Sequence, residues 1–507
     1  MKKLSKILTL ALATVMSVSV FAACGGGTGG GGKTPNAETD VQIYMWKSGY
    51  GTEFMQQIVD KFNAKQSKYK ATLDTDSVAA TIIKSLENGK SNTYDLYFTM
   101  LNTTQYNKQF IKLDDVLDYK NDGESKSIRE KYYSYLLDGV KNADGTTNFL
   151  TYGNGWTGIV YNANIIDGVK YKVPNTTDEL NKLVARLAND DSLTSGKNKV
   201  YPWLFYNDSN NNGYWNYETM VWEAQYDGLD YYYNNMLALK DENGVSPSKE
   251  VFTKKDGRYQ ALKVLENIVT PTTVHPMCTS TNFTNVQKLF LDGEAVFGVN
   301  GGWLMNESSG KVKNIVMMKT PVISSIVEKL EDTAMTDATL SAIITEIDEG
   351  KTSSELCSAN DFARIKQARN LLYNNASEQY VFIPEYSNAI DGAKEFLKYL
   401  YSDEGIATYM KVTSLPGSAR LDNESLYSTA SLDDWHKRQH ELAGEVTALT
   451  EKLTKSFIFT NNSMNQFAAV PYAQALCAQN QKDKKTADEL WAQITSKINK
   501  NWSDWAK

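Results

Sequence analysis

Histidine and cysteine are scarce in this chain, which contains three histidines and four cysteines among 507 residues. Cys278, Cys357 and Cys477 are far apart in the sequence, and no pair of them has the spacing of metal ligands. Because they are three, at most one disulfide could form among them. The sequence therefore predicts no cysteine metal site and no network of disulfides.

Two of the histidines, His436 and His440, lie four residues apart beside Glu441, and this spacing can bind zinc on a helix. The order of residues is not that of the HExxH motif, and the surrounding sequence is charged and helical. A solvated helix face is the favoured interpretation, so we expect no metal and no cofactor.

Signatures of nucleophilic catalysis and of nucleotide binding are also missing. The chain has no GxSxG motif, no phosphate-binding loop and no cysteine with an evident catalytic base. Its 60 acidic residues still offer pairs of carboxylates, which are the catalytic groups of glycoside hydrolases. A glycoside hydrolase therefore stays open as an alternative to a binding protein.

The chain has no excess of positive charge and, beyond its N-terminus, no apolar run long enough to cross a membrane. Residues 1–23 contain three lysines and no acid, so removing them changes the formal charge from −7 to −10. An acidic chain of this kind argues against nucleic acid as a partner.

The N-terminus has the order of a secretory signal. Lys2, Lys3 and Lys6 precede an apolar run over residues 7–20, and Phe-Ala-Ala-Cys follows at 21–24. This end resembles a bacterial lipobox, which implies cleavage before Cys24 and a diacylglyceryl group on its sulfur. We therefore expect residues 1–23 to be a lipoprotein signal peptide and the protein to be anchored at the outer face of the cell membrane. The alternative is an ordinary signal peptide followed by a chance cysteine.

A glycine-rich segment, GGGTGGGG at residues 25–32, follows Cys24. Such a sequence cannot bury enough apolar surface to fold, and it behaves as a flexible chain. No strand precedes these glycines and no GK[ST] ends them, which argues against a phosphate loop. Residues 24–40 are therefore predicted to be the lipidated cysteine and its tether.

The first part of the folded chain alternates between strand and helix patterns. Strands are predicted at residues 41–46, 71–75 and 94–99, and helices at 53–65 and 78–88. This alternation predicts an α/β fold with a largely parallel sheet. Ligands of such sheets lie beyond the carboxyl ends of the strands, which places a site at Trp46–Gly51 and Thr99–Thr104.

Aromatic residues are abundant, with 30 tyrosines and ten tryptophans. Sugar-binding surfaces need flat apolar faces with a polar edge, and both residue types supply them. The richest stretch, residues 201–233, contains Trp203, Trp215 and Asp208. We expect Trp203 and Trp215 to contact a ligand, with a place in the core of a lobe as the alternative. Asp208 is a candidate polar contact.

Seven short motifs occur in the order known from one family, between about residues 41 and 420. They are the opening strand with Trp46 and its glycine loop, Tyr94-Asp-Leu-Tyr-Phe, Gly158-Ile-Val-Tyr-Asn, Pro174-Asn-Thr-Thr-Asp-Glu-Leu, Gln287-x-x-Phe-x-x-Gly-x-Ala-x-Phe, Gly302-Trp303, and the late helix from Ala393 with Ser402-Asp-Glu-Gly. The chain is similar to the extracellular solute-binding proteins that feed oligosaccharides to ABC importers, the group that includes maltose-binding protein.

The resemblance implies a two-lobed periplasmic-binding-protein-like fold of type II, with a ligand cleft between lobes that are joined by crossing segments. The first lobe is expected at residues 41–155 plus 381–420, and the second at 156–320 plus 421–507. The family often joins residues near 321 and 381 more directly than this chain does. We interpret residues 324–380 as a helical insertion near the hinge.

The resemblance also implies site residues. Trp303 matches the cleft tryptophan of the family and is the first candidate for a ligand contact, with a buried structural tryptophan as the alternative. Trp46 and Tyr50 follow from the first loop, and Glu307 is a second polar candidate. Arg420 lies near the third crossing segment and is expected either in the cleft or at the surface.

One departure from the family concerns the segment near residue 153, where a proline is usual. Here Asn154, Gly155 and Trp156 occupy this place. Because aromatic residues often mark sugar subsites, Trp156 is a further candidate for a ligand contact.

Together these features predict a monomeric lipoprotein that captures an oligosaccharide by closing its lobes and delivers it to the permease of an ABC importer, without breaking a bond. A lipid-anchored glycoside hydrolase and a peptide-binding lipoprotein are the alternatives.

Overall fold

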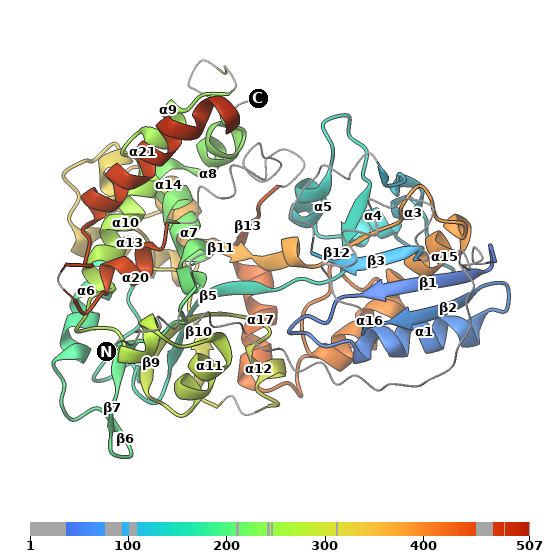
Figure 1. Ribbon diagram of the computed structural model, residues 1–507, viewed down its shortest axis with the longest axis horizontal. Coiled ribbons are helices and arrows are strands. Elements are labelled where there is room, and N and C mark those ends of the chain that lie inside the picture. The colour runs from blue at the N-terminus through green and yellow to red at the C-terminus, as the bar shows by residue number, and fades with distance from the viewer. Residues whose placement is uncertain are drawn as a thin grey trace, which may run out of the picture. The chain divides into compact units, whose positions relative to one another are not determined.

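The computed structural model describes residues 37–76, 94–100, 109–208, 212–240, 244, 247–310, 313–452, 470–480 and 482–505 (Figure 1). The expected signal peptide, Cys24, most of the tether, the helix predicted at 78–88 and residues 101–104 of the expected site therefore lie outside the described residues. No helix in the described part of the chain is both long and apolar enough to cross a membrane.

The first lobe is built on a five-stranded sheet in the order β2-β1-β3-β12-β4. Its strands are β1 (Asp40–Met45), β2 (Lys70–Asp74), β3 (Leu96–Thr99), β4 (Phe149–Thr151) and β12 (Tyr380–Phe382). Its helices are α1 (Glu53–Lys65), α3 (Asp114–Leu117), α4 (Ile128–Lys131), α5 (Ser134–Val140), α15 (Ile390–Leu400) and α16 (Asp403–Thr413). Figure 1 shows the late helices α15 and α16, in orange, beside the early helix α1, in blue.

The side chains of β1 alternate between the two faces of this sheet. Val41, Ile43 and Met45 belong to the apolar core that α1 and α15 complete, whereas Tyr44 belongs to a separate aromatic cluster. Successive side chains of a strand point to opposite faces, so β1 supplies both clusters. The apolar spacing of Phe54, Ile58 and Phe62 predicted helix α1, and all three side chains are buried in it.

The second lobe is built on a six-stranded sheet with the path β13-β11-β5-β9-β8, and β10 also pairs with β5. Its strands are β5 (Trp156–Asn162), β8 (Tyr201–Trp203), β9 (Ala295–Gly301), β10 (Ile315–Met317), β11 (Leu371–Asn374) and β13 (Thr447–Leu449), and the hairpin β6 (Thr194–Ser195) and β7 (Asn198–Lys199) stands apart. The α-helices are α6 (Thr177–Ala188), α7 (Trp215–Asp227), α8 (Leu229–Tyr231), α9 (Glu250–Thr253), α10 (Gly257–Ile268), α11 (Phe283–Leu291), α12 (Leu304–Glu307), α13 (Asp337–Asp348), α14 (Ala359–Arg369), α17 (Asp434–Glu445), α20 (Tyr472–Leu476) and α21 (Ala487–Trp505). Short 3-10 or π turns are η3 (Asn212–Tyr214), η4 (Tyr232–Leu237), η5 (Pro276–Thr279), η6 (Ser324–Lys329), η7 (Asn375–Glu378) and η8 (Glu424–Leu426).

Strand directions confirm the expectation of a largely parallel sheet, with one exception in each lobe. Strands β1, β2 and β3 pair in parallel, as do β8 with β9 and β11 with β13. The exceptions are β12, which runs antiparallel to β3 and β4, and β5, which runs antiparallel to β9, β10 and β11. Both exceptions are strands that enter a sheet directly from the other lobe.

The chain passes between the two sheets three times. It leaves the first sheet after β4 and enters the second at β5, and it returns from β11 to β12 through η7. The third passage runs from the end of α16 to α17, which packs on β10. Crossing segments of this kind join the two lobes, and they place the carboxyl ends of β1 and β9 toward each other.

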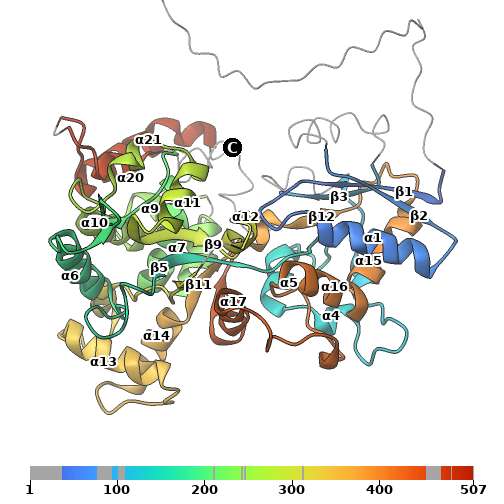
Figure 2. The ribbon, with the colours of Figure 1, turned by 90° about the horizontal axis from the view of Figure 1, so that it is seen from below.

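Residues 324–380 contain more than the helices expected there. Helices α13 and α14 pack against each other (Figure 2) and bury residues such as Ile343 and Ile365 in the core of the second lobe. Helix α14 ends at Arg369, and Leu371–Asn374 forms β11 between β13 and β5. The stretch thus contributes a strand to the middle of the second sheet.

A buried ion pair network fixes the outer part of the first lobe. The side chain of Lys131 is fully buried, and its Nζ lies 2.5 Å from Glu124 and 3.1 Å from Asp403. It also donates to the carbonyl of Tyr401, and Asp403 accepts the amide of Asp422. One ammonium group therefore pairs with two carboxylates, and these contacts hold α4, α16 and the chain after α16 together.

We predict that Lys131→Ala destabilises the first lobe by about 3–5 kcal/mol, because removing one partner leaves the other charges buried without compensation. Urea unfolding monitored by circular dichroism measures this loss. Lys126→Ala is the matched control, since Lys126 is an exposed lysine paired with Asp422 and its loss should change stability by less than about 1 kcal/mol. Equal effects of the two substitutions would show that the network contributes little.

Candidate functional site

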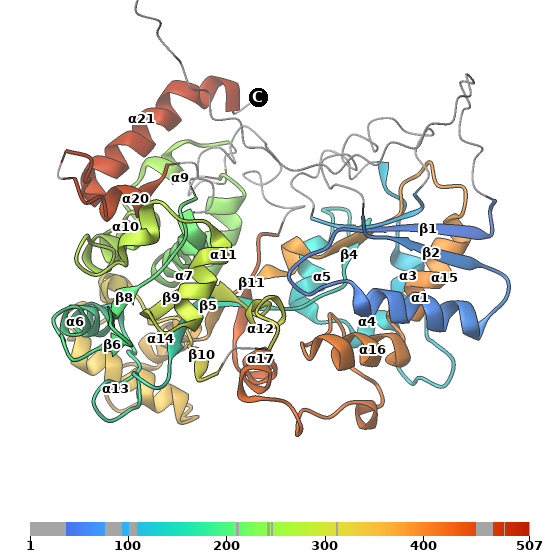
Figure 3. The same ribbon diagram turned by 60° about the horizontal axis from the view of Figure 1, so that its bottom comes forward.

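The loop after β1 meets the turn after β9, although the two belong to different sheets (Figure 3). A Cβ atom at Gly49 would lie 2.6 Å from Glu307 Oε1 and 2.8 Å from Trp303 Cβ. A side chain other than hydrogen has no room there, so glycine is what allows the backbone of the first loop to approach Trp303 and α12 this closely.

Trp303 bridges the lobes. Its ring folds back over Gly301, where a Cβ would lie 2.1 Å from the nearest ring atom. The side chain is 5% exposed and belongs to the apolar core of the first lobe, although it follows a strand of the second sheet. Its ring meets Tyr50 with centroids 6.5 Å apart and Tyr214 with centroids 5.7 Å apart, both edge-on. The tryptophan is thus a lobe-to-lobe contact in this structure.

Tyr50 is anchored at the crossing between β11 and β12. Its hydroxyl accepts a hydrogen bond of 2.9 Å from Asn375 Nδ2, and the side chain is 5% exposed. Trp46, earlier in the same loop, is half-buried against the aromatic cluster of Tyr44, Tyr97 and Phe382. The first loop therefore presents two aromatic residues at the carboxyl end of β1.

Tyr214 is held in an unusual backbone conformation. Asn212, Gly213 and Tyr214 have φ values of 54°, 66° and 76°, all in the left-handed region. For a bulky residue such as Tyr214 this is a rare conformation that costs of order 1–3 kcal/mol. The half-buried ring lies between those of Tyr206 and Trp303, with centroids 5.1 Å and 5.7 Å away. The packing of this ring against Tyr206 and Trp303 accompanies the strained backbone.

Two tyrosines and two glutamates continue the site toward β11. The rings of Tyr217 and Tyr373 stack with centroids 4.4 Å apart. The Tyr217 hydroxyl donates to Glu378 Oε1 at 2.9 Å, and the Tyr373 hydroxyl donates to Glu451 Oε1 at 2.9 Å. Both glutamates are half-buried.

Three acidic groups face this region without a cation. Burial raises the pKa of Glu378 to about 7, with the charge of Glu307 adding to the rise. Burial also raises the pKa of Glu451 to about 7, and Glu378 adds to it. The exposed Glu307 accepts a hydrogen bond of 2.6 Å from Gln287, and its pKa is raised as well, by desolvation. None of the three has an ion-pair partner among the described residues.

The structure brings together some of the residues that the sequence nominated and separates others. Tyr50, Trp303 and Glu307 meet at one place, and Trp46 lies in the same loop as Tyr50. Trp203 and Trp215 are fully buried in the core of the second lobe, their rings 4.8 Å apart, which is the alternative stated for them.

The remaining candidates are Trp156, Arg420 and Asp208. The side chain of Trp156 is fully buried, with its ring 6.2 Å from that of Tyr135, although its carbonyl accepts the amide of Gly302 next to Trp303. Arg420 is exposed, and its guanidinium covers the ring of Tyr133 at 4.2 Å. Asp208 is half-buried, and its carbonyl accepts a hydrogen bond from Gln474.

Tyr214, Tyr217, Glu378 and Glu451 were not nominated from the sequence. The two tyrosines lie in the aromatic stretch 201–233, so the signal for them was present but did not distinguish them from Trp203 and Trp215. Glu378 and Glu451 carry no local signal, because only the packing of η7 and β13 beside α7 brings them here.

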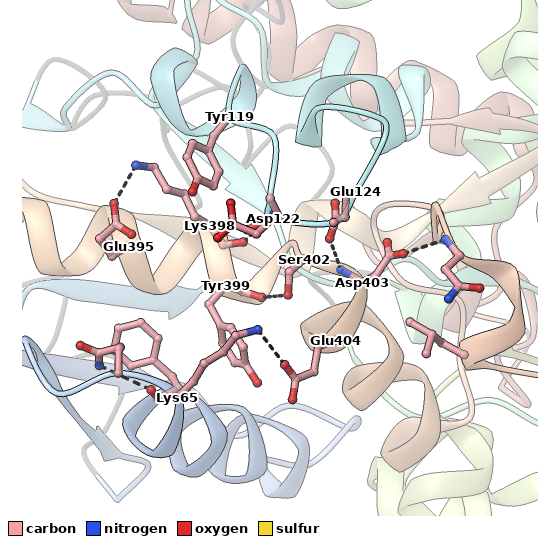
Figure 4. A pocket seen from close by; sticks show the side chains of 16 residues that line it. Lys65, Tyr119, Asp122, Glu124, Glu395, Lys398, Tyr399, Ser402, Asp403 and Glu404 are labelled. Atoms are coloured by element: carbon pink, nitrogen blue, oxygen red, sulfur yellow. Dashed lines mark hydrogen bonds and ion pairs between the residues drawn. The ribbon is translucent and has the colours of Figure 1, made fainter.

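A separate cavity of about 500 Å³ lies in the first lobe between α1, the loop at 119–124, α15 and α16 (Figure 4). Its charged side chains pair with neighbours, as Lys65 does with Glu404 and Lys398 with Glu395. Lys398 also covers the ring of Tyr119 at 4.4 Å. This cavity is lined by the first lobe alone, so the meeting place of Tyr50, Tyr214 and Trp303, to which both lobes contribute, remains the candidate site.

Metal chemistry finds no support at any of these places. Among the described residues, no group of three or more histidine, cysteine, aspartate or glutamate side chains could hold a metal ion. His436 contacts Asp433, and His440 contacts the carbonyl of Ser414. Both histidines thus take part in local contacts around α17.

A family model described as "Bacterial extracellular solute-binding protein" matches residues 57–440, which is more than half of the chain. A search of curated proteins finds no match. Among solved structures, the chain is similar to the apo-form of RafE from Streptococcus pneumoniae, with a TM-score of 0.58 and 14% identity over 92% of this chain and 99% of that one. Another structure with the same fold shows RafE in complex with raffinose, with a TM-score of 0.56 and 13% identity over 90% and 99% of the two chains.

Two further solved structures have the same fold. The GacH receptor of Streptomyces glaucescens, solved unliganded and with acarbose, has a TM-score of 0.57 and 14% identity over 91% and 97% of the two chains. A family 1 extracellular solute-binding protein from Bifidobacterium longum subsp. infantis has a TM-score of 0.56 and 13% identity over 92% and 100% of them. At these identities the likeness shows the two-lobed fold.

The raised pKa values of Glu378 and Glu451 lead to a prediction on how the stability of the protein depends on pH. A glutamate whose pKa is raised by folding contributes stability that is present below its unfolded pKa and is lost as the pH rises through the folded pKa. Glu378 and Glu451 should therefore weaken the ligand-free protein between about pH 4.5 and pH 7, by about 1–3 kcal/mol each.

The measurement is the melting temperature from pH 4.5 to pH 8 for the wild type, Glu378→Gln and Glu451→Gln. Glutamine keeps an oxygen that can accept from Tyr217 or Tyr373 but does not ionise, so each variant should lose less stability over this range than the wild type. Glu424→Gln, at an exposed glutamate, should follow the wild type. If the melting temperature changes with pH in the same way in all four proteins, the prediction is wrong.

Proposed function

This chain belongs to the bacterial extracellular solute-binding proteins, and on that premise we propose that it captures a carbohydrate, in particular an oligosaccharide, for an ABC importer. Solute-binding proteins of this family deliver their ligand to a permease in the membrane. The proposed partners are therefore the ligand and the transmembrane subunits of an importer.

The observation that carries the proposal is the meeting of Tyr50, Tyr214 and Trp303 between the lobes, bordered by glutamates. Aromatic faces pack on the C–H faces of pyranose rings, and acceptor-rich groups take sugar hydroxyls. Glu307, Glu378 and Gln287 supply such polar groups on one side of the aromatic residues. RafE with raffinose and GacH with acarbose, which share the fold, support a saccharide as the ligand class.

The proposed mechanism is closure of the lobes on the ligand. Tyr50 comes from the first lobe, whereas Tyr214 and Trp303 come from segments of the second. A ligand that contacts both sets favours the closed state, since those contacts exist together only when the lobes approach. The closed form would then dock on the permease, and this chain would break no bond.

We test the ligand class by thermal shift against panels of saccharides and peptides. A ligand at 100 times its Kd adds about 2.7 kcal/mol of stability, which is a readily measured rise in melting temperature. Saccharides should raise it and peptides should not. If peptides shift the melting temperature and saccharides do not, the carbohydrate proposal fails in favour of a peptide-binding lipoprotein.

Substitutions test the site once a ligand is found. Trp303→Ala and Tyr214→Ala should each weaken the affinity by about 10- to 100-fold, as expected for central aromatic contacts. Trp502→Ala is the matched control, because Trp502 lies on α21, which packs on α9 and α10, and it should leave the Kd unchanged. Isothermal titration calorimetry gives the Kd, and the melting temperature without ligand shows whether each variant is folded. Unchanged affinity in both cleft variants would place the ligand elsewhere.

A glycoside hydrolase is the second candidate, because a carboxyl group with a pKa near 7, such as that of Glu378, suits a general acid. A reducing-sugar assay on the saccharides that bind distinguishes the two. We expect no turnover, and turnover that is lost in Glu378→Gln would establish the hydrolase instead.

The proposed location is the outer face of the cell membrane, through a lipid on Cys24. Incorporation of a labelled fatty acid in cells measures this modification directly. The wild type should carry the label and partition with membranes, whereas Cys24→Ser should carry none. If the wild type carries no label, the N-terminus is an ordinary secretory signal without a lipid anchor.

A further inference from the structure

The side chain of Asn154 connects all three segments that pass between the lobes. Asn154 itself lies in the first passage, between β4 and β5, and is fully buried. Its Oδ1 accepts a hydrogen bond of 2.7 Å from Asn374 Nδ2, at the start of the second passage. Its Nδ2 donates to the Gly417 carbonyl at 3.4 Å, in the third passage, and to the Tyr135 hydroxyl on α5 at 2.9 Å.

Backbone bonds tie these passages together in pairs. Tyr152 donates its amide to the Gln379 carbonyl, and Asn375 donates its amide to the Gly155 carbonyl, which joins the first and second passages. Gly153 and Gly417 form an antiparallel bridge between the first and third. Each of these backbone contacts joins only two passages, whereas the side-chain amide of Asn154 bonds to both of the other passages.

Asn374, which bonds to Asn154 Oδ1, links this connection to the candidate site. Asn374 is also fully buried, and its Oδ1 accepts the amide of Ala376 at 3.0 Å, which caps the turn η7. That turn contains Asn375, whose side chain bonds to the hydroxyl of Tyr50, and Glu378, which bonds to Tyr217. Any rotation of the second passage relative to the first therefore moves groups that border the site.

An asparagine is well suited to this place. A primary amide offers one acceptor oxygen and two donor hydrogens on the same short side chain, and Asn154 uses both kinds. A carboxylate would lack the donors, and an apolar side chain or a proline would leave the amide of Asn374 and the hydroxyl of Tyr135 without this partner. Buried polar groups without partners are costly, so the local chemistry requires the amide.

We propose that Asn154 is a positioning residue that clamps the hinge, so that the three passages bend as one unit and the lobes close along a single path. The role of this clamp in ligand capture rests on the proposed function. The motion that it restricts, however, belongs to the ligand-free protein as well.

The test measures interlobe distances by double electron–electron resonance in the ligand-free protein. Spin labels are placed at Asp391→Cys on α15 and Glu349→Cys after α13, both exposed positions, in a Cys24→Ser, Cys357→Ser background. The remaining cysteines, Cys278 and Cys477, are buried. Asn154→Ala should increase the population of distances outside the main peak about tenfold, which corresponds to about 1.4 kcal/mol.

Thr176→Ala is the matched control for loss of a buried polar contact. Thr176 is also fully buried and caps α6 through a hydrogen bond from the Glu179 amide, but it lies in no passage between the lobes. It should lower the melting temperature without changing the distance distribution. A distribution for Asn154→Ala that matches those of the wild type and of this control overturns the clamp.

Two milder variants keep the proposal testable if Asn154→Ala does not fold. Tyr135→Phe removes a single acceptor, and Asn374→Ala removes the donor to Asn154 Oδ1. Each should broaden the distribution, and the double variant Tyr135→Phe with Asn374→Ala should broaden it further, because the two act on different atoms of Asn154. Distributions as narrow as the wild type in all of them overturn the proposal.

Failure of the proposed function gives a different result. In that case no saccharide narrows or shifts the wild-type distribution, yet the broadening caused by Asn154→Ala is still present without ligand. The two outcomes are therefore separable in one set of samples.

Discussion

Three passages of the chain between two sheets are the constraint from which the other features follow. Each sheet receives strands from segments that arrive from the other lobe, so β12 and β5 must run against some of their neighbours. The mixed sheets are a consequence of this path. The same path places η7, with Asn375 and Glu378, where both lobes can reach it.

The candidate site depends on close approach of two backbones. The missing side chain at Gly49 lets the first loop reach Trp303 and Glu307, and the missing side chain at Gly301 lets the ring of Trp303 fold over its own strand. Aromatic pairs then hold this geometry by edge-on contacts. The strained backbone at Tyr214 fits the same picture, because strain persists only where the surrounding structure imposes it.

The region around the aromatic residues also contains acidic side chains that have no cation partner in the described part of the chain. Glu378 and Glu451 each accept a hydrogen bond from a tyrosine hydroxyl. Burial raises the pKa of each to about 7, with the charge of Glu307 adding to the rise at Glu378 and the charge of Glu378 adding to the rise at Glu451. The buried ammonium of Lys131 in the first lobe is instead paired with Glu124 and Asp403.

Local sequence determined the elements and part of the site. Apolar spacing in residues 53–65 predicted helix α1, because such a pattern acts through neighbours in the chain. Ordered motifs predicted the two-lobed fold, and they nominated Tyr50, Glu307 and Trp303, which do meet.

Only the tertiary structure decided where each aromatic side chain packs. Trp156, Trp203 and Trp215 lie in cores, whereas Tyr214 lies beside Trp303. The physical reason is that burial of an aromatic side chain depends on what packs against it from distant parts of the chain, and the same residue types serve both purposes. Glu378 and Glu451 show this most clearly, since no local pattern marks an acid that reaches Tyr217 or Tyr373 only through the packing of distant segments.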